Sequence, residues 1–326
     1  MTASNARNEN VDFVKGLLIW GVIWGHTITA LSAGKFDSPV WIHTFFRTYD
    51  LPLFMILSGY FFQQSCNKYS LKELLLNKTG MLLVPIVFWN LVNCSWSVFY
   101  FLWAVFISSL ICIPIRRLRP VCQIPVMLAI VALFHYFKVP WNMFYLFPFF
   151  CIGFLSGRPF IVKGRCSILL IIAFVTGLCF WKSAYTPWQV GYDAWKSDAM
   201  ALAVYAFRFI LAVTGAFVMS QFFFRIKGLL PERVQAFFIE TGKKTLALYV
   251  LQTFVIEKAL NKVMLLANPV FYDIVPDTVH ALTGYVIAPL LSVAVIMLLR
   301  QIIGLLERSK YTSWVFGTRL EFLRKV

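Results

Sequence analysis

The sequence contains few charged residues. Only 13% of its 326 residues are Asp, Glu, Lys or Arg, whereas 60% are hydrophobic. A soluble domain carries roughly 25% charged residues, because its surface must face water. This shortage argues against an ordinary soluble fold, and we expect most of the surface to face lipid.

Clustered metal-ligating residues are also lacking. The seven cysteines are scattered, mostly within apolar runs, and form neither a CxxC pair nor a cluster with the four histidines. Structural zinc sites and disulfide frameworks both need such spacings. We therefore expect no metal site and no disulfide framework.

Acidic residues are scarce as well. There are 14 Asp and Glu against 30 Lys and Arg, which gives a net charge of +16. The basic residues sit in short clusters between apolar runs, so they suit topology signals and anionic headgroups better than a nucleic-acid partner.

Long apolar runs make up most of the chain. A spanning helix needs about 20 mostly apolar residues, and we predict an all-α membrane protein of about ten such helices. No linker interrupts the series, so residues 1–326 are predicted to form one membrane domain, with residues 308–326 as an interfacial C-terminal tail. The first ten residues are polar, and we expect the first run to be an anchor, not a cleaved signal peptide. The predicted spans are 11–33, 39–63, 80–95, 97–115, 121–137, 142–157, 166–181, 199–223, 244–266 and 281–305.

The basic residues predict the orientation of these spans. With the N-terminus inside, 21 of the 30 Lys and Arg fall in cytoplasmic segments, six fall outside and three lie within spans. This asymmetry repeats from loop to loop and follows the positive-inside rule. We therefore expect both termini to be cytoplasmic, in a cell (inner) membrane that is bacterial.

Ionisable residues within the first span are the leading functional candidates. Side chains of this kind are costly in a bilayer and mark functional sites by default. Lys15 and His26 are eleven residues apart, which places them on one helix face, about 16 Å apart along the axis. Lys15 alone is explained as a snorkelling residue, and His26 as a packing histidine or as a general base.

Other polar residues fall within later spans. Arg47 and Asp50 can meet on one helix face, and a structural ion pair is the favoured interpretation. Pro52 is predicted to break this helix, because it lacks a backbone donor. Arg208 and Glu257 either line a cavity or pair with each other.

Four segments together resemble the acyltransferase-3 family of membrane acyltransferases. Lys15 followed after ten residues by His26 is similar to the family's first-helix signature. Residues 51–60, LPLFMILSGY, resemble its Pro-Leu-Phe…Ser-Gly-Tyr motif, and residues 147–153, FPFFCIG, its Phe-Phe-x-x-Gly helix. Residues 242–249, GKKTLALY, resemble its Gly-x-x-Ser-Leu-x-x-Tyr segment. The four segments occur in family order along most of the chain.

Some positions depart from the family pattern. Lys15 stands where Arg is commoner, Asp50 where His is typical, and Gln252 where many members have His. The family's Arg-x-x-Arg pair is reduced to Lys78 with Met81.

The resemblance implies transfer of an acyl group, usually acetyl, from cytoplasmic acyl-CoA to a hydroxyl of an extracytoplasmic glycan or lipid-linked sugar. Acetyl-CoA would be a co-substrate, and no permanently bound cofactor is expected. His26 and Asp12 are the catalytic candidates, with His26 as general base, and Lys15 and Lys78 are the acyl-CoA-binding candidates. The candidates for a cavity or acceptor site are Arg47, Asp50, Ser58, Arg208, Tyr249 and Glu257.

Two alternatives come from other functional classes. A transporter or flippase for a lipid-linked saccharide would also need deep charges and an interrupted helix. A non-catalytic scaffold would explain the topology but not His26. Dependence on acyl-CoA separates the enzyme from the flippase, because a flippase does not consume it.

Overall fold

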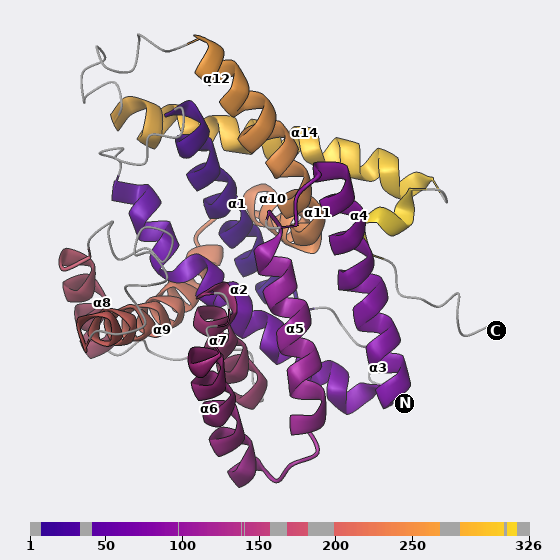
Figure 1. Ribbon diagram of the computed structural model, residues 1–326. Coiled ribbons are helices and arrows are strands. Elements are labelled where there is room, and N and C mark those ends of the chain that lie inside the picture. Colours follow the sequence, from indigo (N-terminus) through magenta and orange to yellow (C-terminus); the bar gives the residue numbers. More distant parts are fainter. Residues whose placement is uncertain are drawn as a thin grey trace. The chain divides into compact units, whose positions relative to one another are not determined.

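The computed structural model describes residues 8–32, 41–96, 98–137, 139, 141–156, 168–181, 199–267, 281–309 and 312–317. All regular structure among them is helical, which confirms the all-α class (Figure 1). A helix lies on each of the ten segments predicted to span the membrane.

The chain divides into two compact units, each made of two separate stretches of sequence. The first contains residues 1–50 and 220–306, and the second contains residues 51–219 and 307–326. All three divisions fall inside long helices: α2 (Trp41–Lys68), α9 (Ala199–Lys227) and α14 (Ala288–Arg308). One membrane domain over residues 1–326 stays a prediction.

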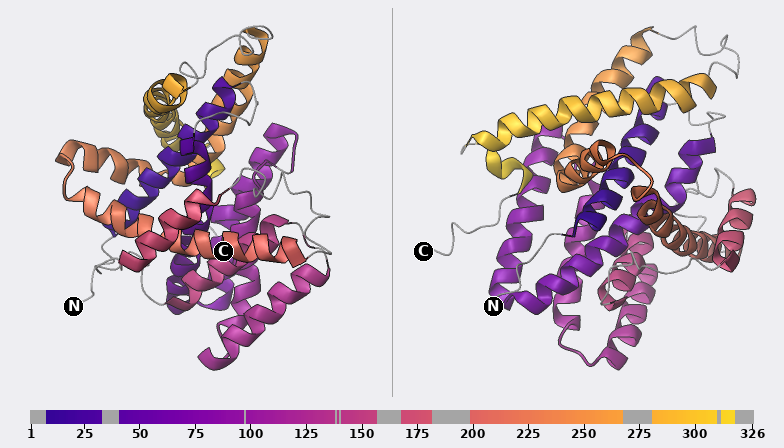
Figure 2. Two further views of the ribbon diagram at one scale, coloured as in Figure 1. Left: turned by 90° about the vertical axis from the view of Figure 1, so that its left-hand side faces the viewer. Right: turned by 180° about the vertical axis from the view of Figure 1, so that it is seen from behind.

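The first unit holds the beginning of α2, the end of α9 and the helices that follow it. Its remaining elements are α1 (Glu9–Leu31), α10 (Glu232–Lys243), α11 (Thr245–Gln252), the π-helix η4 (Thr253–Leu260), α12 (Asn261–Ala267), the π-helix η5 (Thr283–Ile287) and α14 (Ala288–Arg308). Figure 2 shows α14, in yellow, beside α1, in indigo.

A close contact between α1 and α10 organises the first unit. A Cβ atom on Gly16 would lie 2.0 Å from the carbonyl oxygen of Phe238, and one on Gly242 would lie 1.8 Å from that of Asp12. Only glycine lets two helix backbones approach this closely. The contact sets the position of α1, the helix that carries both Lys15 and His26.

The second unit holds the rest of α2, the beginning of α9 and the elements between them. These are α3 (Leu71–Lys78), the π-helix η1 (Thr79–Leu83), α4 (Val84–Asn93), α5 (Tyr100–Ile115), α6 (Pro120–Tyr136), α7 (Trp141–Ser156), α8 (Ile168–Cys179) and the 3₁₀ turn η6 (Ser313–Phe316).

A second pair of glycines joins α2 to α7 in this unit. A Cβ atom on Gly59 would lie 2.0 Å from the carbonyl oxygen of Phe150, and one on Gly153 would lie 1.8 Å from that of Ile56. Each glycine therefore faces the backbone of the opposite helix. The two helices are thus packed backbone against backbone, without side chains between them at these points.

Among the residues that the structure describes, four helices are long and apolar enough to cross a membrane: Glu9–Leu31, Leu71–Asn93, Ala203–Lys227 and Thr283–Arg308. Of these, α1 is the most buried: 61% of its most apolar stretch is enclosed, against 28–44% for the other three. Exposed apolar side chains on α6 and α8, such as Leu128 and Leu169, suit contact with lipid. The ten-span arrangement and the cytoplasmic termini stay predictions.

Reporter fusions test the orientation. Fusions after Arg117 and Lys227 should read cytoplasmic, and fusions within 183–195 should read extracytoplasmic, because the basic residues favour the inner side. A cytoplasmic reading within 183–195 would contradict the ten-span order, whatever the other fusions show.

The predicted break at Pro52 was wrong. The helix α2 runs through Pro52 without interruption, from Trp41 to Lys68. Proline is tolerated inside membrane helices when neighbouring groups satisfy the backbone carbonyl that it leaves without a donor. Pro52 therefore lies inside α2 and does not end it.

The helix α10 was not predicted. It lies in the segment between the eighth and ninth predicted spans, where five basic residues indicated a cytoplasmic loop. At 12 residues, with a polar face, it is too short and too polar for a search for spanning helices to find.

Beyond residue 309, the structure describes the C-terminal segment over residues 312–317, where it packs on α4. The indole Nε1 of Trp89 donates to the carbonyl oxygen of Val315 at 2.7 Å, and its ring stacks on that of Phe316. An interfacial location for the tail 308–326 stays a prediction.

Candidate active site

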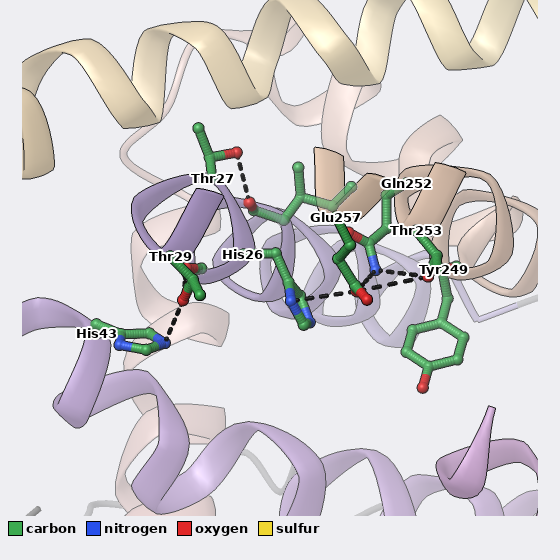
Figure 3. A network of polar contacts seen from close by, with 10 residues as sticks. His26, Thr27, Thr29, His43, Tyr249, Gln252, Thr253 and Glu257 are labelled. Atoms are coloured by element: carbon green, nitrogen blue, oxygen red, sulfur yellow. Dashed lines mark hydrogen bonds and ion pairs between the residues drawn. The ribbon is translucent and has the colours of Figure 1, made fainter. Parts of the chain in front are cut away.

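The first unit brings His26 together with a carboxylate. The Nδ1 atom of His26, on α1, lies 3.3 Å from Oε1 of Glu257, on the π-helix η4, and both side chains are 35% exposed (Figure 3). This exposure leaves room for a third group to reach the imidazole.

Two further side chains hold the Glu257 carboxylate in place. The amide Nε2 of Gln252 donates to Glu257 Oε1 at 2.9 Å, and the hydroxyl of Thr253 does so at 3.5 Å. Gln252 is fully buried and Thr253 nearly so. The carboxylate that faces His26 is thus fixed by buried donors, as Figure 3 shows.

This arrangement favours one tautomer of His26, and so decides which ring nitrogen has the lone pair available. An ionised carboxylate can only accept hydrogen bonds, so the contact favours a proton on Nδ1 of His26. The lone pair is then on Nε2, which does not face Glu257. A neutral imidazole oriented in this way can take a proton from a hydroxyl, and the carboxylate then stabilises the imidazolium that forms.

Hydrogen bonds that α1 donates to the last helices hold the helix that carries His26. The indole Nε1 of Trp20 donates to Ser292 Oγ at 2.8 Å, and that of Trp24 donates to the carbonyl oxygen of Gly284 at 2.9 Å. These bonds tie the middle of α1 to η5 and α14. The imidazole therefore projects from a helix fixed on two sides, by α10 and by α14.

His43, on α2, packs against α1 on a different side from Glu257. A Cβ atom on Gly25 would lie 3.2 Å from its ring, and its Nε2 lies 3.5 Å from Thr29 Oγ1. Figure 3 shows His43 beside Thr29 and away from Glu257. It packs against α1 within the first unit.

Asp12 and Lys15 form a second pair near the start of α1. Lys15 Nζ lies 3.4 Å from Asp12 Oδ1, and their side chains are 22% and 4% exposed. Asp12 precedes His26 by fourteen residues, about 21 Å along the helix axis. The carboxylate that contacts His26 is therefore that of Glu257, and Asp12 orients Lys15.

The other candidates from the sequence are distributed between the two units. In the first unit, the Tyr249 carbonyl oxygen lies 3.5 Å from Thr253 Oγ1, as a second possible acceptor for that hydroxyl. Asp50 is buried. Pairing of Arg47 with Asp50 stays a prediction. In the second unit, Ser58 donates to its own helix at the carbonyl oxygen of Phe54.

Lys78 and Arg208 both lie over aromatic rings of the second unit. Lys78 Nζ is 5.1 Å from the centre of the Phe62 ring, and the Arg208 guanidinium is 4.6 Å from that of Tyr145. Glu257 contacts His26, Gln252 and Thr253 within its own unit.

The partnership of Gln252 with Glu257 was missed in the sequence for a geometric reason. Side chains five residues apart point about 140° away from each other in an α-helix. A π-helix closes i→i+5 hydrogen bonds and brings such residues towards each other. Single π-turns are common at functional sites, but their sequences carry no periodic signal that would reveal them.

These features define a helical membrane protein with an oriented histidine at a partly open position. The sequence matches the acyltransferase domain of the acyltransferase-3 family over residues 8–301, and the chain belongs to this family. The family predicted from the four motifs is thereby confirmed.

Two curated relatives are similar over most of their length. Nodulation protein NolL of Mesorhizobium japonicum is 25% identical over 293 residues, covering 76% of each chain. Nodulation protein NolL of Sinorhizobium fredii is 24% identical over 295 residues, covering 76% of this chain and 78% of the relative. No solved structure matches the chain.

Proposed function

We propose that this membrane acyltransferase moves an acyl group, acetyl in the first instance, from cytoplasmic acyl-CoA to a hydroxyl of an extracytoplasmic glycan or lipid-linked sugar. Its family membership supports acyl transfer. The observation that carries the mechanism is the contact between His26 and Glu257, because it supplies an oriented base in a unit that is otherwise largely apolar.

His26 acts as general base in this proposal. Its Nε2 takes the proton of the acceptor hydroxyl as that oxygen attacks the thioester carbonyl. The carbon–sulfur bond then breaks, and the imidazolium returns the proton to the departing CoA sulfur. Glu257 stabilises the imidazolium between these two steps, and Gln252 and Thr253 keep the carboxylate in place.

Lys15 binds the donor at the other end of the same helix. Its ammonium is partly exposed and oriented by Asp12, and an ammonium is a common ligand for phosphate. The distance of about 16 Å between Lys15 and His26 along α1 is one that the pantetheine arm of acyl-CoA can bridge. Lys78 is a second candidate for contact with the donor.

Mass spectrometry of envelope glycans from cells with and without the gene tests the proposed reaction. Loss of one acyl group per acylated sugar, with the glycan otherwise intact, is the expected difference. Loss of the whole surface glycan would instead indicate a flippase, because such a protein delivers the saccharide and does not modify it.

Glu257→Gln should reduce the rate of acyl transfer about 10²-fold or more, with little change in the KM for acyl-CoA. The amide retains the shape of the side chain but cannot stabilise the imidazolium or enforce the productive tautomer. Glu240→Gln is the matched control, since Glu240 is partly exposed and pairs with Lys243 on α10 of the same unit. Equal rates in the two variants would remove Glu257 from the mechanism.

A further inference from the structure

Arg208 is a buried cation in the second unit. It lies on α9, is 3% exposed, and its guanidinium centre is 4.6 Å from the ring centre of Tyr145 and 5.4 Å from that of Trp181. A guanidinium stays charged in proteins, so the charge itself is buried.

Two of its donor atoms are not satisfied. Within the part of the chain that the structure describes, Nε and Nη1 of Arg208 are buried and have no hydrogen-bond partner. The faces of aromatic rings compensate part of the charge, but they do not accept the in-plane N–H groups in a conventional hydrogen bond. A buried charge with unfilled donors is costly, and inside a membrane protein such a residue is a candidate functional site, which for a cation means a site for an anion.

The surroundings of Arg208 suit a phosphorylated sugar. Tyr205 stacks on Phe144 with ring centres 4.7 Å apart and meets Tyr145 edge to face at 6.1 Å, so flat rings gather on α7 and α9. Aromatic rings with polar tips combine apolar faces, on which a sugar can lie, with hydrogen-bonding groups. The forked guanidinium matches the geometry of phosphate.

The depth of Arg208 is consistent with a ligand that approaches from outside. The helix α9 has 29 residues and is about 44 Å long, which exceeds the roughly 30 Å of the hydrocarbon core. In the predicted orientation its first residue, Ala199, is extracytoplasmic. If α9 is centred on the core, Arg208, nine residues along the helix, lies about 7 Å below the outer boundary, within reach of a lipid-linked phosphate.

We propose that Arg208 binds the phosphate of a lipid-linked saccharide acceptor, through its Nε and Nη1 groups, with the sugar against the aromatic side chains of α7 and α9. This inference rests on the proposed function, because it names the class of acceptor for the same reaction. Trp181 lies beyond the end of α8, where a side chain can move aside without disturbing a helix.

Binding of a prenyl phosphate tests this site without the reaction. The purified full chain in detergent, without acyl-CoA, is titrated with undecaprenyl phosphate and with undecaprenol. We expect undecaprenyl phosphate to bind more tightly than undecaprenol. Arg208→Gln should weaken binding of the phosphate about 10- to 100-fold, the change in affinity that loss of one charge-assisted hydrogen bond produces. Arg208→Lys should retain part of the affinity, since it keeps the charge and loses the fork.

Matched variants separate the possible outcomes. Arg225→Gln, at the exposed cytoplasmic end of α9, should bind as the wild type does. Full competition by phosphatidylglycerol would overturn the proposal, because the site would then be one for bulk lipid headgroups. Equal binding of phosphate and alcohol by the wild type would also overturn it, even if Arg208→Gln fails to fold.

Two further results distinguish this inference from the proposed function. Asp193 and Asp198 lie outside the described residues, and either could be a counter-ion for Arg208 within the chain. That would be the case if their Asn variants lower the folded yield as Arg208→Gln does and the wild type does not bind the prenyl phosphate, and it would overturn the proposal. Phosphate binding that persists in His26→Ala supports the acceptor site by itself. Acyl transfer that proceeds without phosphate binding would refute the acceptor site and leave the transferase intact.

Discussion

His26→Ala should reduce acyl transfer about 10²- to 10⁴-fold, the contribution typical of a single general base. The substitution removes the group that takes the acceptor proton, and it leaves α1 held by Gly16, Trp20 and Trp24. The measurement is transfer of radiolabelled acetyl from acetyl-CoA to glycan extracted from membranes.

A thermal unfolding scan in detergent accompanies this assay. We expect the His26→Ala midpoint to stay near that of the wild type, because the imidazole is partly exposed and its lost contact is with a partly exposed carboxylate. His135→Ala is the matched control: this histidine is exposed and lies against Phe144 in the second unit. Full activity in His26→Ala, with His135→Ala as reference, would contradict the mechanism.

Gly242→Ala should have the largest effect on stability. The added Cβ would lie 1.8 Å from the carbonyl oxygen of Asp12, a backbone atom that cannot rotate away, so α1 and α10 must separate. Overpacking costs roughly 1–3 kcal/mol when side chains can adjust, and we expect about 3 kcal/mol here. Folded yield and thermal midpoint should both fall, and acyl transfer with them, because α1 carries Lys15 and His26.

Gly304→Ala is the control for this change. Gly304 lies on α14, and no atom of the described residues comes within 4 Å of the place that an added methyl group would take. Alanine should therefore be neutral there or stabilise the helix by up to about 1 kcal/mol. If the two alanine variants unfold at the same temperature, the close approach of α1 and α10 does not contribute as described.

The family motifs acquire a physical explanation from these contacts. Gly242, in the fourth motif, meets the backbone of Asp12, three residues before Lys15 of the first motif, and Gly59, in the second, meets the backbone of Phe150 in the third. The four segments thus form two pairs, one in each unit. Their glycines allow close helix packing, which the order of the motifs along the chain does not reveal.

The sequence was informative where a simple periodicity governs the structure. Apolar runs predicted where helices lie, since length and hydropathy determine whether a helix can span a bilayer. The spacing of Lys15 and His26 placed both on one helix, which the uninterrupted α1 provides. These inferences depend only on local geometry.

Inference failed where tertiary packing decides the outcome. The partner of His26 lies far along the chain, on a π-helix whose spacing resembles neither an α-helix nor a strand. Pro52 was expected to break α2, but the helix continues through it. The short helix α10 gains its stability from packing on α1, a contact that no local pattern encodes.

The most direct test of the proposed acyl transfer is acyl-CoA consumption by the purified chain in lipid vesicles. Acetyl-CoA is supplied on one side and glycan acceptor on both, and the release of free CoA thiol is measured together with acetylated glycan. We predict that the two products appear in equal amounts, that CoA release requires acceptor, and that both are lost in His26→Ala. Movement of glycan across the vesicle membrane without CoA release would contradict the transferase and identify a flippase.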